Sequence, residues 1–128
     1  MVMTNIEHRI MEHLLRGSGE VLGALRGCLP TLSVSSRSFS GTGFFAEFSY
    51  RREGLPIPVR DFEIADVEGS SPQLERGFGV VLFIKAGRPD TLEVFTYEES
   101  WPQDLSVMSL YYTGGGEARN FDCFKFPT

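Results

Sequence analysis

The sequence predicts one α+β domain in which an N-terminal helix, or a helix pair, packs on an antiparallel β-meander of about five to six strands. Residues 1–26 carry apolar side chains at helical spacing, and from residue 31 the spacing becomes alternating and rich in β-branched and aromatic residues. Turn residues separate the later segments. The chain has 128 residues and no repeat or low-complexity linker, so residues 1–128 are expected to form a single domain.

The first helix begins with a capping-box pattern. The Thr4 hydroxyl can accept from the backbone N–H of Glu7, and the Glu7 side chain can reach back to the N–H of Thr4. Gly17 ends this helix, whose apolar residues recur at Ile6, Ile10 and Leu14. A second helix, or a bent continuation, is expected over residues 20–26, with a buried side formed by Val21, Leu22 and Leu25.

Strands are expected from residue 31 onward. Segments 31–39 and 44–50 alternate in polarity and flank the glycine-containing turn 40–43, so they predict a hairpin. Two prolines make segment 53–58 a loop or an edge segment that leads to a strand at 62–67.

The later part of the chain is expected to hold a polar loop at 68–77 and a strand near 107–112. A turn at Gly114, Gly115 and Gly116 follows, and segment 120–126 is expected to add an edge strand.

The clearest hairpin pairs 78–85 with 91–97 around the turn 86–90. In a symmetric hairpin, one face combines Val80, Leu82 and Ile84 with Glu93, Phe95 and Tyr97. The opposite face combines Val81 and Phe83 with Leu92, Val94 and Thr96. Both faces are rich in apolar side chains, so this pair belongs in the middle of the sheet, with the N-terminal helix covering one side.

The formal net charge is −5, from 12 basic and 17 acidic residues. Residues 1–64 carry seven of each sign, so the whole excess lies in residues 65–128. Nucleic acids and anionic membranes bind clustered Lys and Arg, so neither is an expected partner. Residues 90–104 are acidic and contain no Lys or Arg, which favours a basic protein as the partner.

Cys28 and Cys123 belong to no metal-binding pattern, so we expect reduced cysteines, with a disulfide between them as the less favoured alternative. The sequence has no secretory-signal pattern and no apolar stretch long enough to span a membrane. We therefore expect a cytoplasmic protein.

Three motifs resemble those of a group of small uncharacterised bacterial proteins. Residues 39–48, 77–97 and Trp101-Pro102 match the patterns TG-x-GFF-x-x-F, then G-x-G-F-x-L-F-I-x-x-G-x-x-x-x-L-E-x-x-x-Y, then WP, with Ser40 in place of the leading threonine. The resemblance covers about residues 39–102 and implies a compact bacterial cytoplasmic domain without an assigned activity. Some bacterial families of similar size with this kind of sheet are immunity proteins, which offers an analogy for function.

Other patterns indicate neither a cofactor nor a metal. Gly41-x-Gly43-x-x-Ala46 matches a dinucleotide-binding pattern, but the aromatic residues around it indicate a hairpin rather than the required helix. His8 and His13 lie roughly 140° apart on a helix and cannot share a metal. His8 and Glu12 could share one only with ligands from elsewhere. No catalytic residue is assigned, because the sequence has no nucleophile-elbow pattern.

Glu93 lies within an apolar strand on the same predicted face as Tyr97. Desolvation there would favour its protonated form, which can act as a general acid, although a structural bond to an N–H or an arginine is the favoured explanation. Glu98 and Glu99 are adjacent, so on an extended chain they point to opposite faces and cannot act as a pair.

The first functional hypothesis is a non-enzymatic, immunity-like protein-binding module that uses its acidic surface. Its candidate interface residues are Asp90, Glu98, Glu99, Trp101 and Asp104. Trp101 would be the anchor, although a tryptophan that caps the core is the favoured alternative. The second hypothesis is a small ligand-binding domain or enzyme with Glu93 and Tyr97 in a pocket between helix and sheet. A homodimer formed by edge strands is the third.

Overall fold

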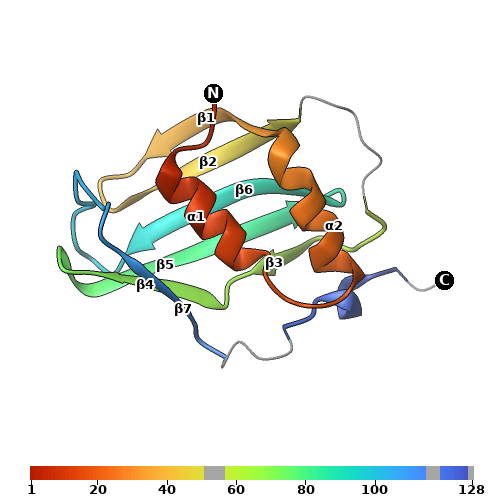
Figure 1. Cartoon of the computed structure of the whole chain (residues 1–128). Helices are drawn as coiled ribbons and strands as arrows, with labels where there is room; N and C mark the ends of the chain where they lie inside the picture. The colour runs from red at the N-terminus through yellow and green to blue at the C-terminus, as the bar shows by residue number, and fades with distance from the viewer. Residues whose placement is uncertain (51–56, 115–118, 127–128) are drawn as a thin grey trace.

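Two α-helices pack on one face of a seven-stranded antiparallel sheet (Figure 1). The computed structural model describes residues 1–50, 57–114 and 119–126. The helices are α1 (Asn5–Leu14) and α2 (Glu20–Cys28), with the short 3-10 helices η1 (Leu29–Thr31) and η2 (Asp122–Phe124). The strands are β1 (Leu32–Phe39), β2 (Gly43–Tyr50), β3 (Phe62–Ile64), β4 (Val67–Ser71), β5 (Leu74–Lys85), β6 (Arg88–Thr96) and β7 (Ser109–Tyr112). This arrangement confirms the predicted α+β class.

The hairpin β5–β6 occupies the middle of the sheet, as predicted. The strand order is β1-β2-β6-β5-β4-β7, and β3 and β4 pair with successive parts of β5. The predicted polar loop at 68–77 is wrong, because this segment contains most of β4 and the start of β5. A Cβ at Gly69 would lie 2.0 Å from the ring of Phe78, so a small residue in β4 is what lets that ring fill the core.

The capping box of α1 is confirmed. Glu7 N donates to the Thr4 hydroxyl at 3.2 Å, and Thr4 N donates to the Glu7 carboxylate at 2.9 Å. The same carboxylate, which is 1% exposed, accepts from Nε and Nη2 of Arg37 on β1 at 2.8 and 2.7 Å. A capping residue of α1 is therefore also the ion-pair partner that ties this helix to β1.

The prediction of an edge strand at 120–126 is wrong, because the segment forms η2 instead. The ring of Phe124 stacks on Phe62 with 4.4 Å between centroids. Asp122 accepts from the N–H of Val21 at 2.9 Å and so caps α2, which has no side-chain cap of its own. These contacts fold the segment back against α2. Most of the predicted loop at 53–58 and of the turn at 114–116 lies outside the described residues.

The faces predicted for β5 and β6 are wrong by one residue. The turn contains only Ala86 and Gly87, with φ of 52° and 74°, and this turn alone would set Val80 opposite Glu93. Asp90 is an extra residue in β6, between the pairs Ile84–Pro89 and Phe83–Thr91, and this bulge shifts the pairing by one residue. The buried face thus combines Val80, Leu82 and Ile84 with Leu92, Val94 and Thr96. The other face combines Val81 and Phe83 with Glu93, Phe95 and Tyr97.

Arg119 joins α1 to the sheet. Its side chain is 5% exposed, and its Nε and Nη2 donate to the two carboxylate oxygens of Asp66 at 2.8 Å each. It also donates to the carbonyl of Leu14, the last residue of α1, at 2.9 Å, and to that of Arg16 just beyond the helix. The guanidinium lies 4.5 Å from the ring centroid of Tyr112 on β7. One side chain thus holds the end of the helix, the β3–β4 connection and an edge strand together.

Replacing Arg119 should destabilise the fold strongly. We expect Arg119→Met to lower the free energy of unfolding by about 3–5 kcal/mol, because a half-buried carboxylate and the helix carbonyls lose their partner. Arg119→Lys should lower it too, since a lysine cannot reproduce the forked set of bonds. Urea denaturation measures both.

Arg76→Met is the control, because the one ion pair that Arg76 makes with a described residue, Glu98, is 3.9 Å long and exposed. This variant should unfold like the wild type. Equal stability of all three variants would contradict the role given to Arg119.

Candidate functional site

The sheet face turned away from the helices is a candidate docking surface, which we call the open face. Both helices lie on the opposite side of the sheet, so no described helix covers it (Figure 1). Side chains alternate along each strand, and those opposite the buried set point to this face. They include Phe45, Glu47, Glu63, Glu68, Val81, Phe83, Lys85, Glu93, Phe95, Tyr97 and Tyr111, together with hydroxyl-bearing residues such as Ser70 and Thr91.

Glu93 lies near the centre of the open face. In the strand register it stands between Phe45 on β2 and Val81 on β5. The Phe45 side chain is 38% exposed, whereas Glu93 and Val81 are half-buried. Within the described residues, the Glu93 carboxylate has no hydrogen bond and no ion pair. A partly desolvated carboxylate without a counter-ion is electrostatically open to an incoming cation.

A second carboxylate on the open face is held by two phenols. Tyr97 Oη donates to Glu68 Oε1 at 3.0 Å, and Tyr111 Oη donates to Glu68 Oε2 at 3.2 Å. Burial, followed by the Glu68 carboxylate, raises the pKa of both phenols above the ordinary tyrosine value. Both tyrosines are therefore protonated hydrogen-bond donors to Glu68 at neutral pH.

Phe95 completes this cluster. A Cβ at Gly79 would lie 2.4 Å from the Phe95 ring, which shows that the ring lies directly over the glycine. The same ring meets Tyr97 edge to face, with 5.6 Å between centroids. The cluster of Glu68, Phe95, Tyr97 and Tyr111 therefore presents a carboxylate beside three aromatic rings.

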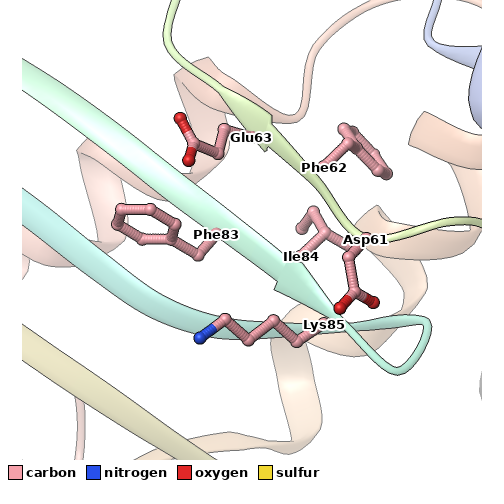
Figure 2. A pocket seen from close by; sticks show the side chains of 6 residues that line it. All are labelled: Asp61, Phe62, Glu63, Phe83, Ile84 and Lys85. Atoms are coloured by element: carbon pink, nitrogen blue, oxygen red, sulfur yellow. The ribbon is translucent and has the colours of Figure 1, made fainter.

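A shallow hollow of about 150 Å³ lies beside one end of the open face, where β3 pairs with β5 (Figure 2). Phe83 and Glu63 are register partners there, and Lys85 lies further along β5. Asp61, which also lines the hollow, accepts from the N–H of Ala86 at 3.0 Å. The hollow adds an apolar ring with charges of both signs at its rim.

The candidate interface residues are close in sequence, but the structure does not bring all of them close together. Asp90 lies at the hairpin end of β6 and Glu98 beyond the other end, roughly 27 Å apart along an extended strand. Glu99 accepts from the N–H groups of Glu75 and Arg76 at 3.0 Å each, and Asp104 accepts from Ser106 N at 2.9 Å. Two of the four predicted carboxylates thus accept hydrogen bonds from the backbone, and Asp90 lies far from the other three along the chain.

Trp101 packs against the core on the helix side of the sheet. Its ring meets Phe44 at 5.5 Å and Phe78 at 6.0 Å between centroids, edge to face in both cases. A hollow of about 160 Å³ beside it is lined also by Ile6 and Arg37. Trp101 thus occupies the position of a core cap rather than that of an exposed anchor.

The expected helix–sheet pocket around Glu93 and Tyr97 is not where those side chains lie. Both belong to the open face, because the bulge at Asp90 turns them away from the helices. Glu68 and Tyr111 lie beside Tyr97, and neither was among the predicted site residues. Glu68 was placed in a predicted polar loop, and Tyr111 lay in the predicted strand 107–112 without a role. The alternation of Val67, Gly69 and Ser71 with Glu68 and Ser70 was the signal for β4.

Other chemistry has little support in the described part of the chain. Residues 1–50, 57–114 and 119–126 contain no group of three or more His, Cys, Asp or Glu arranged to hold a metal ion. Cys28 and Cys123 are free cysteines, and burial raises the pKa of the Cys28 thiol. None of the helices within the described residues is both long and apolar enough to cross a membrane.

Glu99 should stabilise the fold in a pH-dependent way. Its bonds to two backbone N–H groups lower its pKa below the ordinary value of 4.5, so the ionised form favours folding. We expect Glu99→Gln to lower the melting temperature at pH 7. The difference from the wild type should shrink as the pH falls below 4.5 and through the folded-state pKa.

Glu98→Gln serves as the neighbouring control, because among the residues that the structure describes the Glu98 side chain has only the long, exposed contact with Arg76. Its melting temperature should follow the wild type at every pH. A loss in Glu99→Gln that is the same at pH 3 and pH 7 would show that its charge is not responsible.

Comparisons with known proteins find no relative of this chain: no protein-family model matches it, and no curated protein or solved structure matches it significantly. The resemblance over residues 39–102 stays a prediction.

Proposed function

We propose that this chain is a non-enzymatic protein-binding module that holds a basic partner segment on the open face. The observation that carries the proposal is the composition of that face, where aromatic and aliphatic side chains alternate with carboxylates. Among the open-face residues named above, four are glutamates and one is a lysine. Apolar area gives binding energy, and the excess of negative charge selects a Lys- or Arg-bearing partner.

Two positions on the open face suit a cationic side chain. Glu93 offers a half-buried carboxylate between Phe45 and Val81 without a counter-ion among the described residues. The Glu68 cluster offers a carboxylate beside aromatic rings, and ring faces attract Arg and Lys. The proposal moves the acidic interface predicted at residues 90–104 to the open face.

The alternative of a small-ligand enzyme receives less support on this face. The hollow beside Phe83 holds about 150 Å³, whereas small-molecule sites usually enclose about 300–1,000 Å³. A second copy of the chain is also a poor partner for the open face, because carboxylates would face carboxylates. An immunity-like role, with a basic protein as the partner, is one form of the binding proposed.

Peptide display on the immobilised protein tests the proposal with a defined probe. Selection should enrich peptides that combine Lys or Arg with apolar residues, and their binding should weaken as salt is raised. Glu93→Lys and Glu63→Lys should each weaken the selected peptides about tenfold or more by placing like charges together. Phe83→Ala should weaken them by a similar factor.

Glu12→Lys is the matched control, because it makes the same change of charge on α1, on the other side of the sheet. Peptide affinity should be nearly unchanged in this variant. Equal weakening by Glu12→Lys and Glu93→Lys, or selected peptides without basic residues, would contradict binding at the open face.

A further inference from the structure

A groove on the other side of the molecule has the opposite electrostatic character. It lies between α1 and the start of β7 and has a volume of about 470 Å³, three times that of the hollow beside Phe83. Its lining consists of Arg9, Glu12, His13, Arg16, Met108, Ser109 and Leu110. The volume falls within the usual range for small-molecule sites, about 300–1,000 Å³.

Three nitrogen-bearing side chains line this groove. Arg9 and His13 lie four residues apart on one face of α1, and Arg16 follows just beyond the end of that helix. The carboxylate in the lining, Glu12, is 3.0 Å from His8 Nε2. Two arginines against one carboxylate make the groove locally positive in a chain whose net charge is −5.

The arginines are anchored but retain donors. Arg9 Nη2 donates to the carbonyl of Met108 at 3.2 Å, which fixes its side chain across the groove. Arg16 Nη1 lies 3.4 Å from His13 Nδ1. A guanidinium carries five N–H donors, so each arginine keeps several for a ligand, in the planar geometry that matches phosphate oxygens.

His13 is placed to sense a charge in the groove. Its ring stacks on Tyr112 at 4.3 Å, and its Nε2 is buried without a hydrogen-bond partner among the described residues. Burial, then Arg16 and Arg119, hold the pKa of His13 below its ordinary value, and Asp66 acts in the other direction. A bound anion would offset the two cations and make a second ring proton easier to hold.

We propose that this groove binds the phosphate group of a small anionic ligand, through Arg9 and Arg16. A long phosphate backbone fits less well, because nucleic-acid sites need an extended basic stripe and this positive area spans only two helical turns. The site is separate from the open face and does not depend on the function proposed for it.

Titration with inorganic phosphate and with glycerol 2-phosphate tests the site, with sodium chloride adjusted to hold the ionic strength constant. The His13 ring signals are followed by NMR over pH. Both probes should shift these signals and raise the His13 pKa, and sodium acetate distinguishes a phosphate site from a general oxyanion site. If neither phosphate probe shifts His13 at 50 mM or below, or if acetate binds as tightly as both, the proposal is overturned.

The variants of this groove should change its phosphate affinity in opposite directions. Arg16→Gln and Arg9→Gln should each weaken phosphate binding about tenfold, as expected when one charge-assisted contact is lost. Glu12→Gln should tighten it severalfold by removing the carboxylate from the lining. Arg9→Lys keeps the positive charge at this position. Comparing it with Arg9→Gln separates the effect of losing the contact with the ligand from the effect of losing the bond to Met108.

His8→Gln is the control on the same helix, since His8 does not line the groove. Glu93→Lys on the open face is a second control, and neither should change phosphate affinity. A Glu12→Gln variant that binds more weakly, or Arg16→Gln and Arg9→Gln variants that bind like the wild type, would contradict the assignment.

Discussion

The position of α1 on the sheet depends on the bonds of Arg119. A guanidinium is buried at low cost only where most of its donors meet acceptors, and Asp66 with the carbonyls at the end of α1 provides them. A shift of the helix by one turn, about 5.4 Å, would leave both the cation and those carbonyls unpaired. The ion pair between Glu7 and Arg37 fixes the other end of the same helix. Apolar packing alone would allow the helix to slide along the sheet more easily than these directional contacts do.

Fixing α1 on one face of the sheet determines where the chemistry of the surface lies. The helices cover the apolar side of the central strands, so aromatic rings and carboxylates collect on the opposite side, the open face. The outer side of α1 and the start of β7 form the positive groove. The two proposed binding surfaces, which differ in charge, thereby lie on different sides of a small domain, where each would favour a different class of partner.

Local patterns predicted the elements whose stabilising contacts are close in sequence. The capping box at Thr4, the buried side of α2 and the β5–β6 hairpin depend on residues close in sequence, although its turn is Ala86-Gly87 rather than the predicted 86–90. The segments 68–77 and 120–126 were predicted wrongly because their structure depends on distant partners. Glu68 on β4 pairs with Tyr111 on β7, and Asp122 caps a helix that lies about a hundred positions earlier.

The sequence by itself determined the fold class, the two helices, most of the strands and an excess of acidic residues in the second half of the chain. The tertiary structure decided which face those residues share. Side chains in a strand alternate, so the single extra residue at Asp90 transfers Glu93 and Tyr97 from the expected helix side to the open face. The groove of Arg9 and Arg16 likewise exists only because β7, far along the chain, pairs at the edge of the sheet near α1.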